Sequence, residues 1–142
     1  MASKDVSILK AITPVDGGLN NYTSIQADTM EKRQTVYRAI QNAGVLKDHI
    51  NVPMKVVDVI VREAHDIVDD AKEGTVRDGH ITTFILEDGS AVGTNSSTAK
   101  TALDAIMGVF GQPHVDWDVL TIVPKMQNSG NGRSFITLDV VI

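Results

Sequence analysis

The order of predicted elements between residues 54 and 142 restricts the fold more than any other feature of this sequence. Val57, Val59 and Val61 put β-branched side chains on one face of an extended segment, which is typical of a strand. Asp88-Gly89 favours a tight hairpin turn between two further strands. A helix and two more strands follow. The predicted strands are residues 54–68, 81–86, 91–94, 117–126 and 134–142, with the helix between the third and the fourth.

That helix has clear start and stop signals. Ser96 or Ser97 can cap its first turn, Gly111 ends it, and Pro113 prevents it from resuming. Apolar residues recur at helical spacing between these points: Ala99, Ala102, Leu103, Ile106, Met107 and Phe110. Three strands, a helix and two strands are the order of a five-stranded OB-fold barrel. The sequence therefore predicts an α+β, mainly β domain of OB-like type.

The N-terminal part predicts an addition to this barrel. Residues 1–20 contain Pro14 and a Gly pair, so we expect a flexible arm there. A short strand at 22–27 and a helix at 29–43 follow, and Asp28 has capping-box spacing to Glu31. Residues 21–142 would then form a single domain. A generic α+β sheet with both helices on one face is the alternative architecture.

Composition excludes several classes of protein. The chain has no Cys, so disulfides and thiolate metal sites cannot form. No apolar run approaches the length that spans a bilayer and the N-terminus lacks a signal-peptide pattern, so we expect a cytoplasmic protein. His65-Asp66 lies near acidic residues 69 and 70, but a solvated strand end explains this cluster better than a metal site. Phosphate-binding and nucleophile-elbow motifs are absent. We therefore expect no enzyme activity, cofactor or metal.

Basic residues favour a binding function. OB-fold ligands lie across the second and third strands and between the first and last hairpin loops, here residues 69–79 and 127–132. Lys72 and Arg77 belong to the first loop, and Lys125 and Arg133 flank the second. A groove that follows a nucleic-acid backbone needs cations at such places. The net charge of −5 opposes binding to polyanions in general but permits a local basic groove.

Exposed aromatic rings would supply base stacking. Tyr37 and Phe110 lie on helix stripes and are expected in the core. Phe135 alternates with Ile136 and its apolar partners, so it should face outward, whereas the orientations of Trp117 and Phe84 stay open. The candidate nucleic-acid-binding residues are Phe84, Trp117, Phe135, Arg133, Lys125, Arg62, Lys72, Arg77, Tyr22 and Lys55.

Four segments together resemble small phage-encoded single-stranded DNA-binding proteins. They are Asn21-Tyr22-Thr23-Ser24-Ile25, residues 83–89, residues 107–113 and residues 132–140. The resemblance covers about residues 21–142. It implies an OB-like fold, a replication role in an infected bacterium, and cooperative coating of single-stranded DNA by a possible homo-oligomer. The chain ends in a predicted strand, so recruitment of partners through an acidic tail is not expected. A self-assembling phage structural or interaction module without nucleic-acid affinity is the alternative function.

Overall fold

The computed structural model describes residues 21–68, 76–130 and 132–142, without the side chains of residues 66, 68, 76 and 77. The expected arm at residues 1–20 lies outside the described residues. The elements follow one another in this order: β1 (Tyr22–Thr23), α1 (Met30–Asn42), β2 (Gly44–Val45), the 3-10 turn η2 (Leu46–His49), β3 (Met54–Val68), β4 (Val76–Leu86), β5 (Ala91–Thr94), α2 (Ser97–Phe110), β6 (Leu120–Asn128) and β7 (Ser134–Val141).

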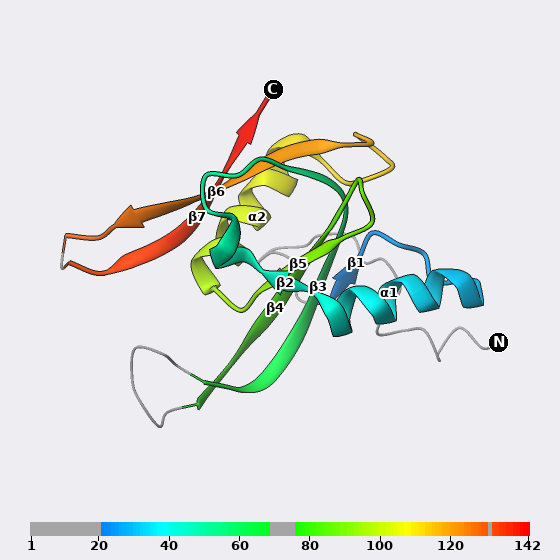
Figure 1. Cartoon of the computed structure of the whole chain (residues 1–142), viewed down its shortest axis with the longest axis horizontal. Coiled ribbons are helices and arrows are strands. Elements are labelled where there is room, and N and C mark those ends of the chain that lie inside the picture. Colours follow the sequence, from blue (N-terminus) through cyan, green and yellow to red (C-terminus); the bar gives the residue numbers. More distant parts are fainter. Residues whose placement is uncertain (1–20, 69–75, 131) are drawn as a thin grey trace.

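All strands belong to one curled sheet with the order β2-β5-β4-β3-β6-β7 (Figure 1). One side of β3 pairs with β4, and its other side pairs first with β6 at Met54–Val56 and then with β1 at Ile60–Val61. The prediction of an α+β, mainly β fold is confirmed. Within the described residues β5 and β7 do not pair, so the sheet is an open half-barrel rather than a closed five-stranded one.

The two helices pack on opposite faces of this sheet. We define the inner face as the one under α2, where Val59, Phe84 and Leu103 belong to the larger hydrophobic cluster. The outer face is the one under α1, where Val36 and Ile60 belong to the smaller cluster. This arrangement differs from the alternative with both helices on one face, because each face of the central strands carries its own apolar set.

An irregularity in β3 changes which of its residues point to the inner face and which to the outer face. The register with β4 shifts between Val56 and Asp58, which is the signature of a β-bulge. Val56, Val59 and Val61 consequently lie in the inner cluster, whereas Val57 packs on the outer one. The expectation that Val57, Val59 and Val61 share a face was wrong, because a bulge is invisible in a simple alternation of residues.

The helix caps are set by local side chains. The Thr29 hydroxyl, not Asp28, accepts the backbone N–H of Lys32 at the start of α1, and Asp28 instead pairs with the Lys32 ammonium. Ser96 caps α2 by accepting the Ala99 N–H at 3.1 Å. Gly111 ends α2 with φ 91°, a left-handed conformation that glycine adopts without strain. The predicted start and end of α2 are confirmed.

Several strand boundaries differ from the sequence expectation. β4 begins at Val76 instead of residue 81, so Arg77 belongs to a strand and the first hairpin loop is shorter. β6 begins at Leu120 instead of 117, because Pro113 and Trp117 bridge across a tight turn in which the His114 N–H donates to the Trp117 carbonyl. The short strand expected at 22–27 is only Tyr22–Thr23. Among the described helices, none combines the length and apolarity needed to cross a membrane.

Candidate nucleic-acid interface

Helix α1 covers the outer surface of the strands on which an OB-fold ligand was expected to lie. Val36 and Ala39 of α1 cluster there with Ile85 of β4 and Ile60 of β3. The approach is close at β5, where a Cβ added to Gly93 would come within 3.3 Å of the Ala43 Cβ. The outer face of β4 and β5 is therefore occupied by the protein's own helix.

Helix α1 does not cover the outer face of the hairpin formed by β6 and β7. Residues opposite each other in an antiparallel pair share a face. Lys55 pairs with Thr121, Lys125 with Thr137, and Gln127 with Phe135. The residues between them in the sequence point to the other face of the sheet, where Ile136, Leu138 and Val140 pack against the inner cluster.

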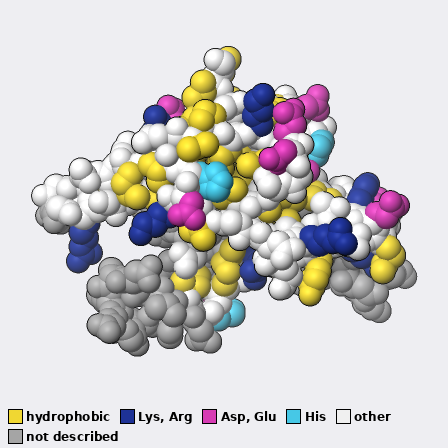
Figure 2. Space-filling model, in the orientation of Figure 1, with side chains coloured by type: hydrophobic (Ala, Val, Ile, Leu, Met, Phe, Trp, Pro, Cys, Tyr) yellow, Lys and Arg dark blue, Asp and Glu magenta, His cyan; other side chains and the backbone are white. Residues whose placement is uncertain are grey.

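The outer face of the hairpin also carries the pair Val123 and Asp139, in which Val123 is buried and Asp139 is exposed. We call the resulting set of side chains the β6–β7 surface: Lys55, Thr121, Lys125, Gln127, Phe135, Thr137 and Asp139, with Arg133 at the hairpin turn. Phe135 is partly exposed and belongs to neither hydrophobic cluster, in agreement with its expected outward orientation. Arg133 is exposed in a turn closed by the Ser129 N–H, which donates to the Arg133 carbonyl at 2.7 Å. Figure 2 shows Lys and Arg side chains along the lower side of this hairpin.

Two aromatic candidates belong to the core instead of a surface. Phe84 is 0% exposed and pairs with Val59, and Tyr22 is 2% exposed and pairs with Val61. Both lie on the inner face against the α2 cluster. Burial raises the pKa of Tyr22 to about 12, and the nearby Asp58 carboxylate adds to this rise. In this structure neither ring presents a face on which a base could stack.

Trp117 stabilises the turn that follows α2. Its Nε1–H donates to the Gly111 carbonyl at 3.0 Å, and its ring packs against the inner cluster while remaining partly exposed. Phe110 also packs there, as expected. Tyr37 differs from the expectation because it is 64% exposed. Val36, Ala39 and Ile40 form the contact with the sheet, and Tyr37 points away from that side of α1.

The remaining basic candidates are dispersed. Lys72 lies outside the described residues, and so does the side chain of Arg77, whose backbone pairs with Ile67. Arg62 pairs with Ile81 and lies on the outer face of β3. Its Nε is buried and has no hydrogen-bond partner within the described part of the chain. The structure therefore places Lys125, Phe135 and Arg133 near the turn of the β6–β7 hairpin, with Lys55 farther along the same face beside Thr121, and it separates them from Tyr22, Phe84 and Trp117.

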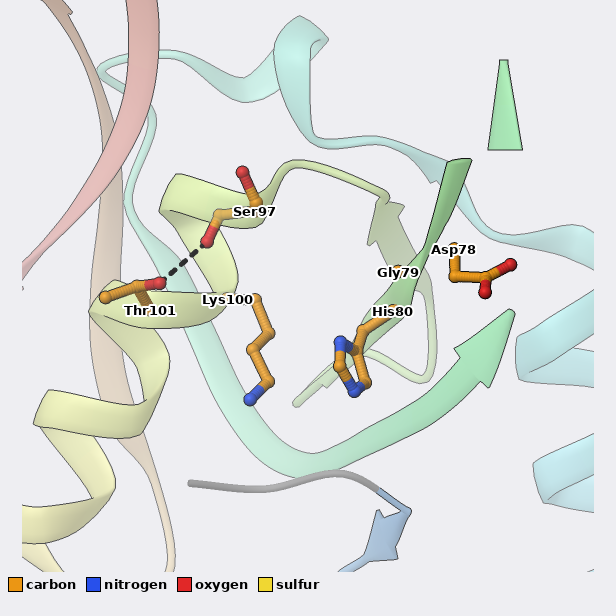
Figure 3. A pocket seen from close by; sticks show the side chains of 6 residues that line it. All are labelled: Asp78, Gly79, His80, Ser97, Lys100 and Thr101. Atoms are coloured by element: carbon orange, nitrogen blue, oxygen red, sulfur yellow. Dashed lines mark hydrogen bonds between the residues drawn. The ribbon is translucent and has the colours of Figure 1, made fainter. Parts of the chain in front are cut away.

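The inner side of the molecule contains a pocket of about 330 Å³ between β4 and α2 (Figure 3). The Lys100 side chain is only 10% exposed there, and its ammonium lies 2.8 Å from the Asp104 carboxylate. Burial and the Lys100 charge lower the pKa of His80, so this ring is neutral at physiological pH. The Thr101 hydroxyl donates to the Ser97 carbonyl of the same helix. Among the described residues that line the pocket, none is an unpaired cation that could attract a phosphate.

A second polar cluster has a structural role. Asp58 Oδ1 accepts the Ser24 hydroxyl at 2.8 Å and lies 2.7 Å from His114 Nε2. The Ser24 oxygen also accepts the Val59 N–H. These hydrogen bonds connect β1 and the turn after α2 to β3. The Ser24 hydroxyl bonds to Asp58 and not to the His114 ring, so the cluster lacks the hydroxyl–imidazole pair that nucleophilic catalysis requires.

Metal-binding chemistry has no clear basis in the described residues. Where the sequence suggested an acidic cluster, His65 Nδ1 lies 3.0 Å from Asp78 Oδ1, and residues 69 and 70 lie outside the described part of the chain. Across residues 21–68, 76–130 and 132–142, no group of three or more His, Asp or Glu side chains is placed to hold an ion.

Comparison with known protein families gives a match over almost the whole described chain. The Phi29 family model, described as phage single-stranded DNA-binding protein, matches residues 20–141. No curated protein and no solved structure matches the chain.

Proposed function

The chain belongs to the phage single-stranded DNA-binding protein family, and we propose that it coats single-stranded DNA during phage DNA replication in the host cytoplasm. Binding is non-catalytic and largely independent of base sequence. The family match covers nearly all of the described residues, so it refers to the whole folded unit. We also propose that β3, β4, β5, β6 and β7, with α2 before β6, are an OB-like core to which β1, α1 and β2 are added.

The observation that supports this function best is the placement of one aromatic ring beside cations on a part of the sheet that α1 does not cover. Phe135 shares the outer face of the β6–β7 hairpin with Lys125, and Lys55 lies on the same face of β3. A ring can stack on any base, and lysine or arginine can follow the phosphates, so this combination binds single strands without reading sequence. We propose that the β6–β7 surface is the primary contact for DNA.

A negative total charge is compatible with this proposal. The chain carries −5 overall, but the β6–β7 surface has three cations, Lys55, Lys125 and Arg133, against one anion, Asp139. Electrostatic attraction falls off over about 8–10 Å at physiological ionic strength, so the local cations dominate at this surface. Binding should therefore be strongly weakened by salt.

Fluorescence anisotropy of a labelled oligo-dT of about 30 nucleotides tests the proposal. We expect binding at low salt, weaker binding as salt rises, and little binding of a matched duplex. Lys125→Ala and Arg133→Ala should each reduce the slope of log affinity against log salt by about 0.7. Lys32→Ala is a control, because this cation is already paired with Asp28. Absence of any anisotropy change at low ionic strength would show that the proposed function is wrong.

One observation favours the alternative of a self-assembling module. Among the described residues β7 pairs only with β6, and Val141 and Ile142 at its end are exposed. An apolar strand at the edge of a sheet can pair with another chain. Light scattering that shows a defined assembly, together with no effect of oligonucleotide, would support this alternative over DNA binding.

A further inference from the structure

Helix α1 covers part of the outer face of the sheet, so its own exposed side forms the surface there. Its contacts with Ile60, Ile85 and Gly93 remove the outer surface of the central strands from solvent. Any ligand that lies across this part of the sheet must therefore meet the exposed side of α1 first. The composition of that side then decides what can bind there.

The exposed side of α1 combines an aromatic ring with arginines. Met30, Gln34, Tyr37 and Gln41 follow one another at spacings of three and four residues, which places them in one line along a helix. Met30 is 76% and Tyr37 is 64% exposed. Arg33 and Arg38 flank this line on its two sides, by their position in the helical repeat. We call these six residues the α1 stripe.

Charge on α1 contrasts with the charge of the whole chain. The helix contains three cations, Lys32, Arg33 and Arg38, and one anion, Glu31, in a chain of −5. Lys32 is paired with Asp28 just before the helix, so Arg33 and Arg38 are the cations that α1 offers to a ligand. Arg33 is held beside the stripe because its Nε donates to the Ala27 carbonyl at 3.1 Å. Figure 2 shows Lys and Arg side chains over α1, with acidic side chains at the right-hand end of the helix.

We propose that the α1 stripe is a second contact surface for single-stranded DNA. Tyr37 acts as a stacking platform for a base, and Arg33 and Arg38 contact the phosphates beside it. The proposal rests on the proposed function and extends it, because both surfaces lie on the outer side of the sheet. Strand β3 connects them, since Val57 packs in the α1 cluster and Lys55 pairs with Thr121 of β6.

The composition of the stripe fits this ligand better than it fits a protein partner. Gln34 and Gln41 interrupt its apolar residues, and arginines border it, whereas a helix that docks an apolar partner presents a continuous apolar row. A single strand offers flat bases and regularly spaced negative charges, which match a ring bordered by cations.

Substitutions at Tyr37 test the stacking contact. Anisotropy with the same oligo-dT of about 30 nucleotides would compare Tyr37→Ala, Tyr37→Phe and the exposed neighbour Thr35→Ala. Loss of one stacked base lowers affinity by about 5- to 150-fold, so we expect this loss for Tyr37→Ala. Tyr37→Phe keeps the ring and Thr35→Ala lies off the stripe, so both should bind within about 2-fold of the natural chain. Arg38→Ala should reduce the salt slope by about 0.7, and Lys32→Ala should leave it unchanged.

The outcomes separate this inference from the proposed function. If the natural chain binds and Phe135→Ala weakens binding, but Tyr37→Ala and Arg38→Ala bind normally, the α1 contact is wrong and the proposed function stands. If the natural chain does not bind at all, both are wrong. If Tyr37→Ala changes the sedimentation coefficient of the free protein and leaves DNA affinity unaltered, the stripe is a contact between copies, which overturns the inference. Circular dichroism of each variant confirms that the fold is retained.

Discussion

The two phenylalanines Phe84 and Phe135 should respond to truncation in opposite ways. Phe84 is 0% exposed inside the inner cluster, so Phe84→Ala leaves a cavity that costs about 3–5 kcal/mol of unfolding free energy. Phe135 is partly exposed and belongs to neither cluster, so Phe135→Ala should cost less than about 1 kcal/mol. Since a small domain is stable by only about 5–15 kcal/mol, this difference is large.

Their effects on DNA affinity should be reversed. Loss of a stack on Phe135 removes about 1–3 kcal/mol of binding free energy, which corresponds to an affinity lower by about 5- to 150-fold. Phe84 has no exposed surface, so Phe84→Leu, which fills most of the cavity, should bind like the natural chain when measured well below its unfolding midpoint.

Urea unfolding followed by circular dichroism measures the stability of each variant, and oligo-dT anisotropy at low salt measures its affinity. The reasoning is refuted if Phe135→Ala loses as much unfolding free energy as Phe84→Ala, because Phe135 would then be a core residue. It is equally refuted if Phe135→Ala stays as stable as the natural chain and also binds DNA with unchanged affinity.

Three further predictions concern stability. Trp117→Phe should lose about 1 kcal/mol, because the Gly111 carbonyl loses the Nε1–H donor, and urea unfolding would detect this. Gly111→Ala should lose about 2–3 kcal/mol in the same assay, since φ is 91° there and a new Cβ would collide with the Asp116 side chain. The pKa of Tyr22 is about 12 in the folded protein and about 10 in the unfolded chain. The contribution of Tyr22 to stability is therefore complete below about pH 10 and is lost as pH rises from 10 toward 12. Tyr22→Phe should show a smaller loss of stability over that range in a pH series of urea midpoints; an identical loss would contradict the assignment.

Local chemistry determined most of the secondary structure from the sequence. Strand β5 and helix α2 match their predicted ranges, and the Asp88-Gly89 turn forms with the Gly89 N–H donating to the Leu86 carbonyl. Caps, turns and periodic apolar residues act over a few positions, so each can be read from neighbouring residues. The outward orientation of Phe135 was predictable for the same reason, since β7 keeps a strict alternation.

Only the tertiary structure decided which surfaces are available. The bulge after Val56 shifts the faces of β3, and the packing of α1 on the outer face covers the central strands and exposes Tyr37. Tyr22 and Phe84 are buried because their long-range partners, Val61 and Val59, face α2. Burial depends on which elements pack together across long sequence separations, and no local pattern records that choice. The order of strands and helix was therefore legible in the sequence, whereas the position of the candidate DNA surface depended on where α1 packs.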